Sequence, residues 1–365
     1  MDISAPTKFQ KLRNYLSQLL VALLLAVAIG SLVTLWVGEN PLQVYLILFQ
    51  EAFLKPRGLM ITIQRATPLI LTSAAATMAF RAGAINMGMA GQFMVGGAFA
   101  AMAGYAFPSL PKLLHVPLAL LLSAAGGAAA AFVPAIFKRM SGISEVITGM
   151  IANLLMPHLL SAVINSSSIL RTARFGAAGG IQDSARLTQF VEMTQGGLGA
   201  GTKANTGILI AIGVVLALAW WIKRSTLGFE VRMTKNNYTF AEFTGINASR
   251  GFFLGMMLSG AIAALAGAVE VLGVWRSYRL GTLVVGWKGL VISLIGAQTF
   301  VGSMIAALFT GAMESGTMNV SWATSIPRPL IDILVELIII FAAVPSMRMF
   351  FSGDDDEHLG GRFIS

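Results

Sequence analysis

The sequence contains no cysteine and only three histidines, and charged residues make up 11% of its 365 positions. A chain without cysteine forms no disulfide and no thiolate metal site. The histidines (His115, His158 and His358) are far apart and show no metal-ligand spacing. Soluble domains carry roughly 25% charged residues, so too few charges are present to cover soluble domains of this total length. A soluble globular protein is therefore excluded.

Hydrophobic residues, in contrast, make up 56% of the chain, and the mean hydropathy is +0.77. These values are typical of an integral membrane protein. The net charge is +9, but the basic residues stand in short loops between apolar segments. Such cations usually face anionic lipid headgroups. We therefore expect membrane lipids, and no nucleic acid, as partners of the basic loops.

The apolar segments are long and continuous, which favours helices over the alternating strands of an outer-membrane barrel. A helix needs about 20 apolar residues to cross the hydrocarbon core. Basic residues precede the first segment, which is too long for a signal sequence and which we interpret as a retained helix. The sequence thus predicts an all-α, polytopic helical bundle with about ten transmembrane helices. The predicted spans are 14–38, 59–80, 84–106, 116–137, 145–163, 207–222, 251–273, 286–299, 301–318 and 329–347.

The distribution of lysine and arginine predicts the orientation. The basic N-terminus and the basic loop 223–250 favour a cytoplasmic location for both termini. The loop 164–206 is then external, and 348–365 is a cytoplasmic tail of a single transmembrane domain, 1–365. The pair of segments within 286–318 is short and interrupted by glycine, which indicates one or two short or broken helices.

Ionisable residues at membrane depth serve either in structural ion pairs or in a transport path. No pair of them has the neighbouring nucleophile, base or metal ligands of an enzyme. Both interpretations therefore stay open for these positions, with a helix-capping role favoured for Glu145. The residues are Arg65, Glu145, Glu270, Glu314, Asp332 and Glu336.

The stretch FRAGAINMGMAGQ (80–92) interrupts two apolar segments with glycines and amides. Irregular backbone at membrane depth is tolerated where protein or a wet cavity satisfies its polar groups. Asn86 and Gln92 either satisfy that backbone or offer hydrogen bonds to a neutral polar solute. Phe93 and Trp287 either pack in the core or stack on a planar substrate. The candidate path residues are Asn86, Gln92, Phe93, Asn153 and Trp287.

Within the loop 223–250, Phe240, Phe243 and Ile246 recur at threefold spacing, which places them near one face of a short helix. An exposed amphipathic turn of this kind suits a helix-in-groove contact with a partner protein.

Several segments closely resemble the permease subunits of bacterial nucleoside ABC importers, a group that also includes ribose, simple-sugar, riboflavin and branched-chain amino-acid permeases. The resemblance covers most of the chain. It is carried by ENPLQVYLILFQEAF (39–53), ATPLILTSAAATMAFRAGAINMGMAGQ (66–92), ISEVITGMIANLL (143–155), LGFEVR and AEFTGINASRGFFLGMMLSGAIAALAGAVEV (within 227–271), and GWKGLVISLIGAQTFVGSMIAALFTGAMESG (286–316).

The resemblance implies a transport subunit of the bacterial cytoplasmic membrane that works by alternating access and is not itself an enzyme. ATP and Mg²⁺ would bind a separate cytoplasmic ATPase, and this chain would hold no cofactor. The other implied partners are a second permease, in a homo- or heterodimer, and a periplasmic or lipid-anchored binding protein. The implied ATPase-coupling residues are Phe240, Glu242, Phe243, Gly245, Ile246 and Asn247.

The sequence also departs from the pattern of this group. Ala90 stands where relatives carry a glutamate, so one charge is missing from the implied path. The expected cargo is a nucleoside-like solute, with a simple sugar, riboflavin or another small solute as the alternative. An ATP-independent channel or a secondary transporter is the alternative from a different class.

Overall fold

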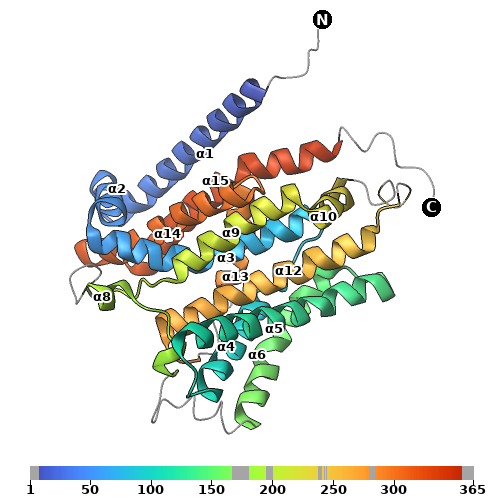
Figure 1. The fold of residues 1–365 in the computed structure, drawn as a ribbon. Helices are drawn as coiled ribbons and strands as arrows, with labels where there is room; N and C mark the ends of the chain where they lie inside the picture. Colours follow the sequence, from blue (N-terminus) through green and yellow to red (C-terminus); the bar gives the residue numbers. More distant parts are fainter. Residues whose placement is uncertain are drawn as a thin grey trace, which may run out of the picture.

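A computed structural model shows an all-helical bundle, as predicted (Figure 1). It describes residues 8–166, 181–194, 200–236, 241, 243, 245–278 and 284–355. The first half contains α1 (Lys8–Trp36), α2 (Pro41–Phe49), the π-helix η1 (Gln50–Leu54), α3 (Pro56–Arg81), α4 (Met89–Ala106), α5 (Lys112–Ser141) and α6 (Glu145–Ser166). The remainder contains η2 (Asp183–Ala185), α8 (Phe190–Met193), α9 (Gly207–Arg224), α10 (Thr226–Asn236), α12 (Ala248–Val269), the π-helix η3 (Glu270–Trp275), α13 (Val284–Ile295), α14 (Phe300–Ala323) and α15 (Arg328–Asp355).

Each predicted span coincides with one of these helices, but length and composition alone qualify fewer of them as spans. Among the described residues, four helices qualify: α5, α6, α9 and α12 continued by η3. Leu20–Trp36 and Pro41–Leu54, which meet at a bend of 119°, qualify together as a fifth. The long helix α3 instead carries buried threonine and serine residues inside the bundle.

The helix α13 is the short member that the sequence predicts. It contains 12 residues, which span about 18 Å at 1.5 Å per residue. That length is well below the roughly 30 Å of the hydrocarbon core. The helix α2 and η1, in contrast, are absent from the predicted spans.

The two halves of the chain have a similar order of helices, and the long helix of each half packs on a helix of the other half. In the first half the long helix α3 is followed by the shorter α4, and in the second α12 and η3 are followed by α13. The helix α3 packs on α14, and α12 packs correspondingly on α5. Close approach is possible because Gly311 faces Ala66 in the first contact, and Gly260 faces Gly127 in the second.

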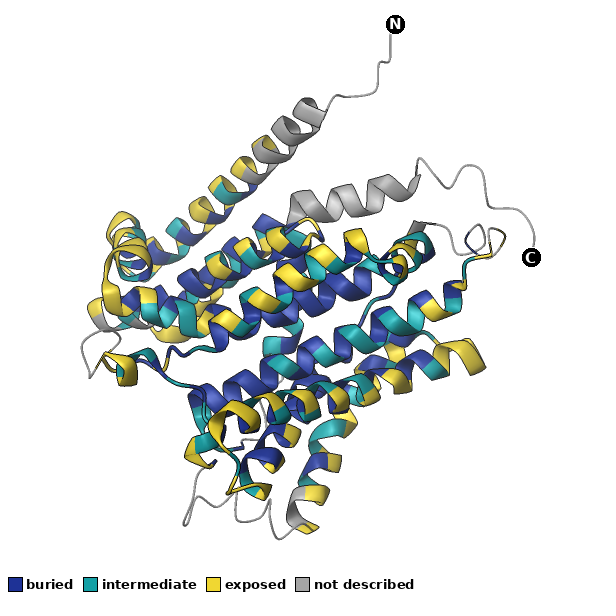
Figure 2. Ribbon diagram, in the orientation of Figure 1, coloured by how far each residue is buried: buried dark blue, intermediate teal, exposed yellow. Residues whose placement is uncertain are grey.

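The burial pattern follows this arrangement. Figure 2 shows that α3 and α12 are largely buried, whereas α1, α5 and α6 present exposed residues. Many of the exposed side chains are large and apolar, for example Leu121 on α5 and Leu154 on α6. Such faces suit a lipid environment.

The two ends of the bundle have different elements. The helices α2 and α8 lie at one end and α10 lies at the other (Figure 1). We call these the α8 end and the α10 end. At the α10 end, Glu145 begins α6 and pairs with Lys138 at 3.1 Å, which agrees with the predicted role of Glu145 at a helix start.

Candidate functional site

The stretch after α3 enters the bundle without helical structure and then begins α4. Its Asn86 donates hydrogen bonds to Gln92 Oε1 at 2.7 Å and to Ser259 Oγ at 2.9 Å. Asn86 Oδ1 accepts from Gln92 Nε2 at 3.0 Å and from the backbone N–H of Gly88 at 3.1 Å. Ser259 lies near the middle of α12 and donates to the carbonyl of Ala75. The start of α4 is therefore deep inside the bundle.

Asn153 of α6 completes this set of contacts. Its Oδ1 accepts from the backbone N–H of Gly91 at 2.7 Å, and its Nδ2 donates to the carbonyl of Met87 at 2.5 Å. We call Asn86, Gln92, Asn153 and Ser259 the amide cluster. These buried groups satisfy the irregular backbone and one another.

The short helix α13 begins beside this point, since Gly286 lies against Ala90. Two residues further along α13, Lys288 Nζ lies 2.7 Å from Glu314 Oε1 of α14 and also pairs with Glu336 of α15. Because one ammonium joins two carboxylates from different helices, the three residues form a charged network, which we call the Lys288 network.

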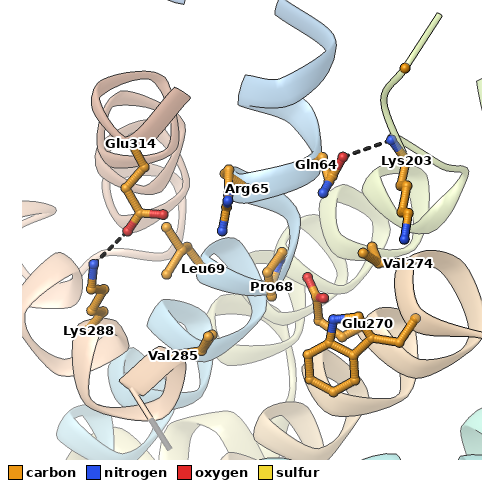
Figure 3. Close-up of a pocket in the computed structure, with 12 residues that line it drawn as sticks. Gln64, Arg65, Pro68, Leu69, Lys203, Glu270, Val274, Val285, Lys288 and Glu314 are labelled. Atoms are coloured by element: carbon orange, nitrogen blue, oxygen red, sulfur yellow. Dashed lines mark hydrogen bonds and ion pairs between the residues drawn. The ribbon is translucent and has the colours of Figure 1, made fainter. Parts of the chain in front are cut away.

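A cavity of about 520 Å³ opens between the Lys288 network and the α8 end. This volume is typical of small-molecule sites. Figure 3 shows charged side chains from α3, η3, α13 and α14 around it. The lining residues are Gln64, Arg65, Pro68, Leu69, Gly201, Lys203, Glu270, Val274, Trp275, Val285, Lys288 and Glu314.

The wall of the cavity that η3 forms carries an aromatic ring and a carboxylate. The ring of Trp275 meets Phe93 edge-on, with centroids 6.4 Å apart and an interplanar angle of 67°. The side chain of Phe93 is fully buried behind it. Glu270 is 9% exposed, and its carboxylate points into the cavity (Figure 3).

The segments 181–194 and 200–206 are attached to this same wall. Leu187 N–H donates to Leu272 O at 3.1 Å, and Gln189 Nε2 donates to Gly273 O at 2.7 Å. Glu192 forms an ion pair with Arg276. At the rim, Lys203 N–H donates to Gln64 Oε1 at 2.8 Å. These two segments therefore contact η3 and α3 around the cavity.

A second hollow lies at the α10 end. It is a groove of about 590 Å³ whose lining includes four cations, Lys223, Arg224, Arg232 and Arg250, together with Gly245, Ile246 and Asn247. Asn247 caps α12 by accepting from Arg250 N–H at 2.9 Å. Nearby in the chain, Phe243 is 87% exposed. A large apolar side chain exposed beside a basic groove is typical of a docking surface.

The structure separates the residues predicted for the transport path. Asn86, Gln92 and Asn153 belong to the amide cluster, Phe93 supports Trp275, and Trp287 is half-buried beside Lys288. None of the five lines the 520 Å³ cavity. Among the residues predicted for coupling, Phe240 and Glu242 lie outside the described residues.

The sequence predicts part of the cavity lining by a different criterion. Arg65, Glu270 and Glu314 stand out as ionisable residues at membrane depth, for which structural and path roles stayed open. Trp275 lies just beyond the predicted span 251–273, where aromatic residues usually mark the membrane interface, and Lys203 lies in the polar loop 164–206. No sequence signal shows that these two side chains meet the other three around one cavity.

A helical bundle with apolar outer faces around a polar, solute-sized cavity defines a multi-pass membrane transport protein. The chain belongs to the branched-chain amino acid transport system / permease component family, whose model matches residues 58–343. It is accordingly an ABC importer permease, a transport subunit rather than an enzyme, and such permeases work with ATPase and binding-protein partners.

Three relatives show the range of cargo within the family. The chain is 32% identical to the guanosine ABC transporter permease protein NupP of Bacillus subtilis, covering 92% of this chain and 94% of that protein. It is 29% identical to the nucleoside permease protein NupB of Lactococcus lactis, covering 89% and 90%. It is 28% identical to the glucose permease protein TsgB13 of Haloferax volcanii, covering 88% and 85%.

Proposed function

We propose that this permease carries a nucleoside across the bacterial cytoplasmic membrane. The observation that supports this cargo best is the cavity, which combines the Trp275 ring with a polar lining that includes Gln64 and Glu270. An aromatic face suits stacking on a planar base, and the polar groups suit the hydrogen-bonding atoms of a base and its sugar. The guanosine and nucleoside relatives support the same choice.

The proposed orientation places the α10 end in the cytoplasm, with both termini on that side. Lys138, Arg139, Lys223 and Arg224 end their helices there, as the positive-inside rule requires. The cavity then opens toward the exterior, where a periplasmic or lipid-anchored binding protein delivers the solute. The single domain 1–365 pairs with a second permease subunit, identical or related.

Uptake measurements test the cargo. The complete importer is expressed in a bacterial host that lacks nucleoside uptake, and labelled nucleoside is supplied with excess unlabelled nucleoside, ribose, glucose, riboflavin or leucine. We expect only unlabelled nucleoside to abolish the signal. No uptake of the labelled nucleoside, or uptake that glucose or riboflavin abolishes as well as unlabelled nucleoside does, would reject the proposed cargo.

The coupling surface is the second part of the proposal. Phe243, with Gly245, Ile246 and Asn247 at the adjoining groove, docks on the ATPase, together with the predicted Phe240 and Glu242. An exposed aromatic anchor at such a contact contributes about 2 kcal/mol or more of binding free energy.

The substitution Phe243→Asp is expected to release ATP hydrolysis from control by solute and to reduce uptake at least tenfold, with the permease still present in the membrane. Phe107→Asp is the matched control, since Phe107 is 42% exposed near the start of the 107–111 loop at the α8 end. Normal uptake by the Phe243 variant would rule out the docking role.

A further inference from the structure

The Glu270 carboxylate has unused hydrogen-bonding capacity. Although its residue is only 9% exposed, the carboxylate accepts no hydrogen bond and forms no ion pair within the parts of the chain that the structure describes. The oxygens of this carboxylate are accessible from the cavity, where the positive charges of Arg65 and Lys203 act on them. Because the carboxylate points into a solute-sized cavity (Figure 3), a ligand can supply hydrogen-bond donors to it.

A complementary group faces the same space. Arg65 of α3 points into the cavity (Figure 3), and no ion pair with it is found among the residues that the structure describes. Its guanidinium presents several N–H donors in a planar fork. The cavity thus offers two acceptor atoms from η3 and a donor fork from α3, with the Trp275 ring also in its lining.

The nucleobases differ in how well they match these groups. A carboxylate binds best to two adjacent N–H donors, since it can accept both at once. Guanine presents such a pair at N1–H and its 2-amino group, whereas hypoxanthine and uracil present a single ring N–H. Adenine and cytosine place an acceptor beside their amino group. Guanine also carries O6 and N7, the acceptor pair that an arginine fork binds bidentately.

Building on the proposed nucleoside function, we infer that the cavity recognises guanine. Glu270 accepts from N1–H and the 2-amino group, Arg65 donates to O6 and N7, and Trp275 stacks on the ring. Binding energy for the base then comes from charge-assisted hydrogen bonds that Glu270 and Arg65 do not make with other described residues. The specificity of the permease toward its cargo therefore depends on two charged side chains from different helices.

The test compares guanosine and adenosine uptake by the complete importer carrying this chain, either wild type or as Glu270→Gln. Glutamine keeps the shape of glutamate. Its amide NH2, however, is a hydrogen-bond donor that would face the N1–H and 2-amino donors of guanine. We expect guanosine uptake to fall about tenfold or more, with adenosine uptake changed less than twofold. Measuring the ratio within one importer isolates the permease, because the binding protein is the same in both strains.

Two further variants keep the result interpretable. Arg65→Lys retains the charge but loses the fork, and it is expected to lower guanosine uptake selectively as well. Glu39→Gln is the control, since Glu39 lies in the turn between α1 and α2 and accepts hydrogen bonds from Ser325. Membrane abundance of each variant is measured by immunoblotting, and uptake is expressed per permease.

The outcomes separate this inference from the proposed function. An equal loss of guanosine and adenosine uptake in both cavity variants, or a wild-type importer that takes up the two nucleosides equally well, would overturn guanine recognition alone. Failure of the wild-type importer to take up any nucleoside would overturn the proposed function too. A selective loss of guanosine uptake supports both.

Discussion

The short helices α4 and α13 begin side by side, where Ala90 meets Gly286, yet their polar surroundings differ. At the start of α4, the amide cluster is neutral and its hydrogen bonds are made within the protein. Near the start of α13, the Lys288 network is charged, and Lys288 and Glu314 line the cavity. The polar groups near these two helix starts therefore have different roles: the amide cluster bonds within the protein, and the Lys288 network contributes to the cavity lining.

The difference teaches how to interpret polar residues inside a membrane protein. Asn86 is fully buried and uses its donors and acceptor on neighbouring backbone and side chains. Glu270, in contrast, has no such partner among the residues described. The state of each group's hydrogen bonds, rather than its polarity, separates a structural role from a role toward a ligand.

The largest expected effect comes from removing the centre of the amide cluster. Asn86→Leu leaves Gln92 and the Gly88 N–H without their partner in a buried place, and each unsatisfied group costs about 1–3 kcal/mol. We expect a loss of about 3 kcal/mol or more in the free energy of unfolding, measured by thermal denaturation of the purified permease in detergent.

Asn40→Ala provides the control for this change. Asn40 caps α2 at a more exposed site, where it accepts from Leu42 N–H at 3.0 Å, and losing such a cap costs about 1 kcal/mol. If Asn86→Leu denatures at the same temperature as Asn40→Ala, the amide cluster does not hold the start of α4.

A smaller effect is expected from the charged side of the comparison. Lys288→Met leaves Glu314 and Glu336 without their shared cation. Breaking a fully buried pair costs about 3–5 kcal/mol, and partial exposure of these side chains reduces the expected loss to about 2 kcal/mol. Thermal denaturation measures the stability, and nucleoside uptake is expected to fall with it.

Adding Glu314→Gln and Glu336→Gln to Lys288→Met removes the charges that were left unpaired. The triple variant is expected to regain most of the lost stability, because replacing all partners of a buried ion pair is often nearly neutral. A triple variant that remains as unstable as Lys288→Met would show that Lys288 acts through packing instead.

The smallest effect concerns the segment 181–194, which is attached to η3. Burial raises the pKa of the Glu192 carboxyl, but its hydrogen bonds with Arg276 and Gln189 N–H and the nearby positive charges lower the pKa below the ordinary value of 4.5 overall. A group whose folded-state pKa is lowered stabilises the protein above its unfolded pKa, and this stabilisation is lost as the pH falls through the folded-state value.

We therefore expect Glu192→Gln to cost less than about 1 kcal/mol at pH 7, since the carboxylate is partly exposed. The difference from wild type should shrink as the pH falls below the ordinary carboxyl pKa of 4.5. Denaturation temperatures measured from pH 3 to pH 7 check this. A difference that persists unchanged at pH 3 would mean that the Glu192–Arg276 charge pair is not its cause.

Much of the fold follows from the sequence, because long apolar segments have few alternatives to helix in a membrane. The helix α2 escapes detection, since its nine residues are too short for the span criterion. The short length of α13 is predictable from its glycines. The cavity is not, because its lining comes from helices that are distant in sequence, and the same residue types also serve as interfacial anchors and ion pairs.

The π-helix η3 has a consequence for how cargo choice can change. A π-helical turn holds more residues than an α-helical one, so the side chains of Glu270 and Trp275 face the cavity in a register that an ordinary helix would not keep. Deleting one residue between them would turn the indole by about 100° relative to the carboxylate. A single-codon deletion there would thus change the positions of the carboxylate and the indole together. A point substitution, in contrast, would change one contact with the cargo at a time.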